Sequence, residues 1–158
     1  MTYYDSIASG YEQLHRNEQL KKLLLIKSNL DLKPDDLMLD VGCGQGFSAE
    51  IFDCKIIGLD PSSKLLKMCP FRTVVGVAEE IPFLDNYFDI VISVTAIHNF
   101  KDYKKGILEM KRVGSRLFVF SVLKKSAHIN NIKELIAEQF RINKILEEDK
   151  DLIFFCEK

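Results

Sequence analysis

Residues 39–47 read Leu39-Asp40-Val41-Gly42-Cys43-Gly44-Gln45-Gly46-Phe47, a glycine-rich turn at the end of the mostly apolar stretch 37–41, which is expected to be a strand. Glycines at alternate positions let the backbone turn tightly and approach a ligand with no Cβ atom in the way. The helix expected after the turn would offer unpaired N–H groups in its first turn. The stretch therefore predicts a strand–turn–helix unit that binds a ligand, and the alternative is a glycine-rich turn without one.

The spacing of these glycines differs from that of two common nucleotide-binding motifs. The dinucleotide fingerprint would need a glycine at position 47, which is Phe47. The P-loop needs a lysine after its last glycine, and none follows Gly46 directly. Neither a dinucleotide site nor a phosphate cradle is therefore favoured at this turn.

Short apolar strands alternate with amphipathic helices along the rest of the chain, which predicts an α/β fold with a mainly parallel sheet. The expected strands are residues 37–41, 55–60, 73–75, 88–94 and 116–123, followed by an antiparallel hairpin of residues 140–146 and 152–156. The longer expected helices are residues 17–30, capped by Asn17, then 103–112 and 127–138. The run 88–94 is almost wholly apolar, so it is expected to be a central strand.

Composition indicates one ordinary globular domain. The 158 residues carry a formal net charge of −1, with 47% hydrophobic and 28% charged residues. The single domain expected over residues 1–158 divides into N-terminal helices (1–30), a Rossmann-like core (37–126) and a C-terminal helix and hairpin (127–158). Four scattered cysteines form no zinc-site pattern. Without a signal peptide or a spanning segment, the chain is expected to be reduced, cytoplasmic and not associated with membranes.

Asp60 is a second candidate for ligand binding. It ends the second expected strand, so in a parallel sheet it would lie beside the glycine-rich turn. A carboxylate at this position can accept hydrogen bonds from both hydroxyls of a ribose. The alternative is that Asp60 caps the helix that begins at Pro61.

Four segments occur in the order typical of one enzyme family. They are Asp40-x-Gly42-x-Gly44-x-Gly46, Gly58-Leu59-Asp60-Pro61-Ser62, Ala78-Glu79-Glu80-Ile81-Pro82-Phe83 and Tyr87-Phe88-Asp89-Ile90-Val91-Ile92-Ser93. Together they resemble the class I S-adenosylmethionine-dependent methyltransferases, in particular the methyltransferase type 11 or UbiE-like subgroup. The opening Tyr4-Asp5-Ser6-Ile7-Ala8-Ser9-Gly10-Tyr11 resembles that subgroup's N-terminal signature. The resemblance implies a Rossmann-like, doubly wound seven-stranded sheet, mostly parallel with an antiparallel C-terminal strand.

The resemblance also implies a cofactor, S-adenosyl-L-methionine (SAM), with S-adenosyl-L-homocysteine (SAH) as the product. Asp40 and the glycine-rich turn would hold the methionine moiety, Asp60 the ribose, and Ala78 and Glu79 the adenine. The full set of predicted cofactor-binding residues is Tyr11, Asp40, Gly42, Cys43, Gly44, Gly46, Asp60, Pro61, Ala78, Glu79 and Ser93. Val77 departs from the family, which commonly has Asp there. The adenine amino group would then bind more weakly, or use the backbone or Glu79.

His98 is the candidate catalytic residue. Methyl transfer from a sulfonium is an in-line displacement, so orientation of the reactants can supply most of the catalysis. A base is needed only if the acceptor arrives protonated, and His98 follows the expected central strand at a suitable place. The alternative is that His98 only structures its loop. No Asn-Pro-Pro-Tyr-type sequence occurs there, which disfavours exocyclic-amine and glutamine-amide acceptors by analogy with the family.

Three hypotheses remain for what the protein acts on. A small-molecule acceptor is favoured, because it is the commonest case in the subgroup. RNA or another translation-related macromolecule is the alternative, because residues 101–125 contain eight Lys or Arg against two acids. The plain interpretation of that stretch is a solvated helix face. The third hypothesis is a non-catalytic cofactor-binding partner subunit, suggested by Val77 and by the absence of a substrate-covering insertion before residue 127.

Overall fold

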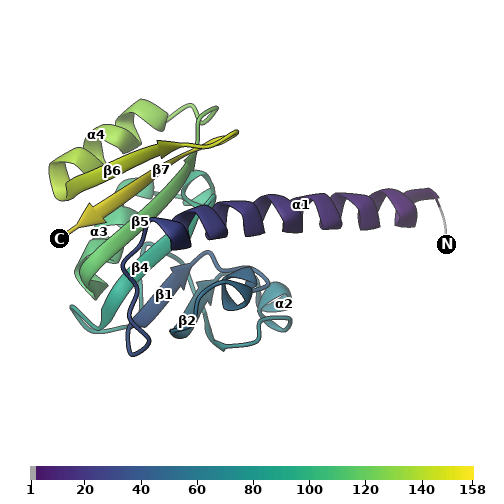
Figure 1. The fold of residues 1–158 in the computed structure, drawn as a ribbon, viewed down its shortest axis with the longest axis horizontal. Coiled ribbons are helices and arrows are strands. Elements are labelled where there is room, and N and C mark those ends of the chain that lie inside the picture. The colour runs from purple at the N-terminus through teal and green to yellow at the C-terminus, as the bar shows by residue number, and fades with distance from the viewer. Residues whose placement is uncertain (1–2) are drawn as a thin grey trace.

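The glycine-rich turn lies at the carboxyl edge of a seven-stranded sheet in the computed structural model (Figure 1). The structure describes the backbone of residues 3–158 and the side chains of residues 12–158. The strands are β1 (Leu37–Val41), β2 (Lys55–Asp60), β3 (Arg72–Val75), β4 (Phe88–Val94), β5 (Gly114–Leu123), β6 (Arg141–Glu147) and β7 (Asp151–Glu157). Their order is β3-β2-β1-β4-β5-β7-β6, with β7 antiparallel to β5 and β6 and the remaining pairs parallel. The predicted sheet is confirmed, including the reversed C-terminal strand and the central place of β4.

Helices flank the sheet on both faces. They are α1 (Tyr3–Ser28), α2 (Ser63–Leu66), α3 (Tyr103–Val113) and α4 (Ile129–Gln139), with 3-10 helices η1 (Phe47–Glu50) and η2 (Ile97–Asn99). The expectation that Asn17 caps the first helix is wrong. Asn17 lies inside the continuous helix α1, where its side chain accepts a hydrogen bond from Gln13 Nε2 at 3.0 Å. Although α1 is long, neither it nor another helix of the described chain is apolar enough to cross a bilayer.

Successive residues of each inner strand face opposite layers of the core, because side chains alternate along a strand. In β4, Val91 packs in the layer that contains Ile107 of α3 and Ile132 of α4. Its neighbour Ile90 packs in the other layer with Ile26 of α1. All five side chains are almost completely buried. This packing explains why β4 is apolar throughout and why the sheet edge, rather than either face, is open for ligands.

The elements around the carboxyl edge are short, apart from α1. Residues 124–128 alone connect β5 to α4, so no insertion covers the sheet edge at this point. Helix α1 extends past the sheet at its N-terminal end (Figure 1). Ion pairs of Arg16 with Glu50 and of Lys27 with Asp53 fasten it beside η1. The helix thereby forms a wall over the carboxyl edge.

Candidate functional site

The turn after β1 has the backbone conformation that its glycines predict. Gly42, Gly44 and Gly46 have φ values of 78°, 54° and 81°, in the left-handed region that favours glycine. A Cβ atom on Gly42 would lie 2.5 Å from the Cβ of Ala96, so the turn packs directly on the segment after β4. A Cβ atom on Gly44 would meet nothing within 4 Å. Gly44 therefore leaves open space at the point where a ligand would approach the backbone.

Asp60 joins this turn to the loop after β2. Its Oδ2 accepts a hydrogen bond from the Gly44 N–H at 2.9 Å, and its Oδ1 accepts one from the Ser62 N–H at 2.9 Å. The cap of α2 is Ser62, whose Oγ accepts from the Leu65 N–H at 3.2 Å. The alternative that Asp60 serves as the helix cap is therefore wrong. Each carboxylate oxygen can still accept a further hydrogen bond, as two ribose hydroxyls would require.

Asp40 lies behind the turn, where it is 5% exposed. Its Oδ2 accepts a hydrogen bond from Ser48 Oγ at 2.6 Å. Burial raises the pKa of Asp40 to about 6, the Ser48 hydrogen bond lowers it in part, and the nearby Asp60 charge raises it further. Asp40 lines a small cavity of about 30 Å³ together with Gln19 and Cys43. The carboxylate is therefore close enough to the turn to influence a charge bound there.

A cavity of about 1130 Å³ lies between the turn and α1. Five polar residues of α1 line it: Glu12, Gln13, His15, Arg16 and Gln19. These five residues are not among those predicted from the sequence. Their spacing of three to four residues is typical of one helix face. This polar face is the feature of the sequence that could have predicted their place in the cavity lining.

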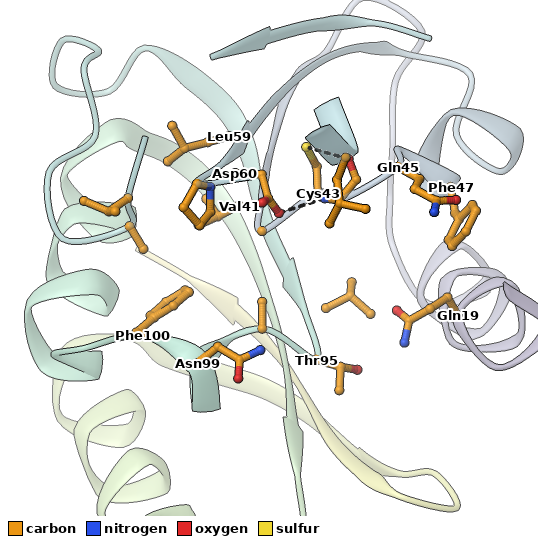
Figure 2. Close-up of a pocket in the computed structure, with 18 of the residues that line it drawn as sticks. Gln19, Val41, Cys43, Gln45, Phe47, Leu59, Asp60, Thr95, Asn99 and Phe100 are labelled. Carbon is orange, nitrogen blue, oxygen red and sulfur yellow. Dashed lines mark hydrogen bonds between the residues drawn. The ribbon is translucent and has the colours of Figure 1, made fainter. Parts of the chain in front are cut away.

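The wall of the cavity that faces Asp60 comes from the segment after β4. Figure 2 shows Thr95, Asn99 and Phe100 across the cavity from Asp60, with Gln19 of α1 at one end. The ring of Phe100 lies against Gly106 of α3, where a Cβ atom would come within 2.7 Å of it. The cavity therefore continues from the glycine-rich turn to a second wall with amide, hydroxyl and aromatic groups.

The loop after β3 forms the third part of the lining. Val77, Ala78 and Glu79 line the cavity, with Ala78 buried and Val77 45% exposed. Glu79 Oε2 accepts a hydrogen bond from the Asp102 N–H at 3.2 Å, which ties this loop to the start of α3. Val77 and Glu79 thus line the same cavity as the glycine-rich turn and Asp60.

The predicted cofactor residues fall into three groups. Those that line the cavity are Gly42, Cys43, Gly44, Asp60, Pro61, Ala78 and Glu79. Asp40, Gly46 and Ser93 lie behind this lining, and Ser93 Oγ donates a hydrogen bond to the Val41 carbonyl at 3.0 Å. The side chain of Tyr11 is outside the described residues. Burial raises the pKa of the Cys43 thiol well above its usual value, so this thiol stays neutral.

His98 occupies an exposed position in η2 and does not contribute to the cavity lining. Partial desolvation lowers the pKa of its imidazole, although the charge of Asp151 opposes this change. A neutral imidazole can accept a proton, but His98 would have to turn toward the cavity to do so. Its catalytic role stays a prediction. Among the described residues, no group of His, Cys, Asp or Glu could hold a metal ion.

Comparison with known proteins assigns the family. A family model described as a methyltransferase domain matches residues 39–117, which include the glycine-rich turn, Asp60 and the loop after β3. The chain belongs to the class I SAM-dependent methyltransferases. An uncharacterised protein of Methanocaldococcus jannaschii is 32% identical over 140 residues, covering 85% of this chain and 54% of that protein. The demethylmenaquinone methyltransferase of Thermotoga maritima is 30% identical over 131 residues, covering 73% and 57%.

Solved methyltransferases share the fold along most of this chain. A SAM-dependent methyltransferase of Thermotoga maritima superposes with a TM-score of 0.73 at 17% identity and covers 98% of both chains. The magnesium protoporphyrin IX methyltransferase of Synechocystis, solved with SAM bound, has a TM-score of 0.74 at 14% identity and covers 91% and 79%. The chain spans about half the length of the curated relatives it matches.

Proposed function

We propose that this chain binds SAM in the large cavity and transfers its methyl group to a small-molecule acceptor. The observation that carries the proposal is that one cavity contains both the glycine-rich turn with Asp60 and the opposite wall at Thr95. Its volume of about 1130 Å³ slightly exceeds that of most small-ligand pockets, typically about 300–1000 Å³. That volume suits a cofactor and an acceptor together.

The residues present fit SAM at one end of the cavity. Asp60 would accept hydrogen bonds from the ribose hydroxyls, and the open space at Gly44 would let the ligand lie against the backbone. Asp40 would stabilise the cationic methionine end, and Ala78 and Glu79 would flank the adenine. When bound, SAM supplies an activated methyl group on a sulfonium centre. Holding the acceptor in line with that centre is then the main task of the opposite wall.

The walls of the cavity favour a small acceptor over RNA. The cations of residues 101–125 are divided in space. Arg116 pairs with Asp36 next to the start of β1, and Arg112 pairs with Asp85 and Glu109, whereas Lys101 and Lys105 line the cavity. Two of the eight cations, Arg112 and Arg116, are thus paired with acids away from the cavity, which lowers the positive charge available to bind phosphates. The relatives named demethylmenaquinone methyltransferases add support for a small acceptor.

A labelling experiment tests the proposal. The purified chain is incubated with SAM that carries a tritiated methyl group, and with a demethylmenaquinone analogue, a low-molecular-weight cell extract or an RNA fraction. We expect label in a small molecule, at a rate that changes little between about 50 and 200 mM salt. Lys104→Glu and Lys125→Glu, which alter exposed cations outside the cavity lining, should not change that rate. Salt-sensitive labelling of RNA, or labelling only after a partner protein is added, would contradict the proposal.

The affinity for SAH is expected to fall when Asp40 becomes protonated. The pKa of Asp40 is raised to about 6, so the carboxylate that would attract the ammonium group of SAH is largely lost at pH 5. If only the deprotonated form binds, the Kd rises about tenfold between pH 7 and pH 5. Calorimetric titrations at several pH values measure this change. Asp40→Asn keeps an oxygen that can accept the Ser48 hydrogen bond, and this variant should bind SAH weakly with no pH dependence in this range. A wild-type Kd that is constant down to pH 5 would refute the role of Asp40.

A further inference from the structure

The turn after β4 contains a strained residue. Thr95 has φ +51°, a left-handed conformation that a β-branched side chain rarely adopts and that costs about 1–3 kcal/mol. Its N–H donates a hydrogen bond to the Ser121 carbonyl at 3.0 Å. The next residue, Ala96, packs on Gly42 of the glycine-rich turn. The conformation of Thr95 therefore sets how the wall opposite the cofactor site meets the turn that would bind SAM.

A buried polar network holds Thr95 in this conformation. Thr95 Oγ1 donates a hydrogen bond to Asp151 Oδ2 at 2.7 Å and accepts one from Lys22 Nζ at 3.0 Å. Lys22 Nζ also forms an ion pair with Asp151 Oδ1 at 3.3 Å. Ser121 Oγ donates a further hydrogen bond to Asp151. The carboxylate of Asp151 in β7 thus contacts α1, β5 and the end of β4.

Stability alone does not explain this network. The side chains of Lys22 and Asp151 are only 3% and 0% exposed. Removing two charges from water costs several kcal/mol per ion, and a buried pair is often no more stabilising than apolar residues of similar size. Asp151 Oδ1 has the ion pair but no hydrogen bond of good geometry. A buried charge pair that holds a strained residue in a cavity wall indicates a functional role.

The same part of α1 is fastened to the turn between β6 and β7 by two further ion pairs. Glu18 pairs with Lys150 at 2.8 Å, and Lys21 pairs with Asp149 at 3.3 Å. Both pairs are partly exposed, so each stabilises the contact only weakly. Together with the buried pair at Asp151, they connect the α1 wall of the cavity to the wall at Thr95.

We propose that Asp151 is a positioning residue of the acceptor site. With Lys22 it holds Thr95 in the left-handed conformation, so that residues 95–96 present a fixed wall to the acceptor beside the glycine-rich turn. The inference rests on the proposed methyltransferase function. Because a misplacement of about 1 Å can cost about 100-fold in the rate of a positioned reaction, a loosened wall would slow transfer. The proposed ribose and adenine contacts, at Asp60 and at Ala78 and Glu79, come from the loops after β2 and β3, which the network does not include. The affinity for SAH would therefore fall much less than the transfer rate.

Substitution of Thr95 tests this inference. Thr95→Val keeps the branched shape and removes both hydrogen bonds, whereas Thr95→Ser keeps the hydroxyl. We expect Thr95→Val to lower the rate of methyl transfer at saturating SAM by roughly 10- to 100-fold, with the calorimetric Kd for SAH within about threefold of wild type. Thr95→Ser should restore most of the rate. Thr73→Val, the same replacement on β3, is the matched control.

A second variant tests the charge pair without leaving one charge buried alone. The double replacement Lys22→Met with Asp151→Leu should fold, because apolar residues can replace a buried ion pair. We expect it to bind SAH but to transfer as slowly as Thr95→Val. Provided that the wild type transfers methyl groups, two results would overturn the inference. One is a wild-type transfer rate in Thr95→Val, and the other is a loss of SAH affinity in that variant as large as its loss of rate. A wild-type chain that binds no SAM or transfers to no acceptor would overturn the proposed function, and this inference with it.

Discussion

Asp60→Ala is expected to weaken the binding of SAM and SAH by at least about 100-fold. The two ribose hydroxyls would lose the carboxylate that accepts their hydrogen bonds. Hydrogen bonds to charged groups contribute about 1.5–3 kcal/mol each. The substitution also removes the acceptor for the Gly44 N–H, which holds the glycine-rich turn in place. The two effects act together on one ligand, so the Kd should rise by at least about 100-fold. Calorimetric titration with SAH measures the change.

Two variants control this result. Asp35→Ala removes an exposed carboxylate just before β1, at the opposite edge of the sheet, and should leave the Kd unchanged. Asp60→Asn keeps an acceptor for Gly44 but loses the negative charge, so an intermediate Kd is expected. Circular dichroism shows whether each variant remains folded. A folded Asp60→Ala chain that binds SAH within about threefold of wild type would place the ribose elsewhere in the cavity.

The strands were predictable because their signals are local. Side chains alternate along each strand and apolar runs end at turn residues, so β1, β2 and β4 have the bounds expected from the sequence. The glycine-rich turn and Asp60 were predictable for a related reason. Both follow strands that point to the same sheet edge, which brings them together without knowledge of the packing.

The network at Asp151 was not predictable in this way. Its members Lys22, Thr95, Ser121 and Asp151 come from distant parts of the chain, and Asp151 falls between the two expected hairpin strands, 140–146 and 152–156. A left-handed Thr has no local signature either, because its conformation is imposed by the contacts around it. The length of α1 was missed for a different reason. An Asn can cap a helix or lie within one, and here the second case holds.

Charge patterning along the chain was also an incomplete guide. Residues 101–125 form one basic stretch in the sequence, but α3 and β5 carry its cations to both ends of the sheet. Neighbouring acids then neutralise several of them, as Glu147 does for Lys124 at 3.0 Å. The net charge of a segment therefore says little about the field at the site until its partners are known.

Arg112→Met is expected to reduce stability substantially, although the Arg112 side chain is 33% exposed. The five N–H groups of Arg112 all donate at 2.8–2.9 Å: to the carbonyls of Ile81 and Phe83, to the Asp85 carboxylate and twice to the Glu109 carboxylate. These bonds hold the loop after β3 against α3. Methionine keeps most of the side-chain volume but removes all five hydrogen bonds. The Ile81 carbonyl and the Glu109 carboxylate each keep one backbone donor, from the Phe83 and Ile81 N–H groups. With the other bonds lost, the free energy of unfolding should fall by about 3 kcal/mol.

Thermal unfolding measures this loss as a decrease in Tm of roughly 6–12 °C for a domain of this size. Arg112→Lys should recover little, because an ammonium group cannot reproduce the five-donor fork. Arg141→Met is the matched control, since its ion pair with Glu157 is long at 4.0 Å and its side chain is 79% exposed. The same loop carries Ala78 and Glu79, so the affinity for SAH should fall along with the stability. If Tm falls and the affinity does not, the adenine wall is held by β3 and by the Glu79–Asp102 contact rather than by the arginine.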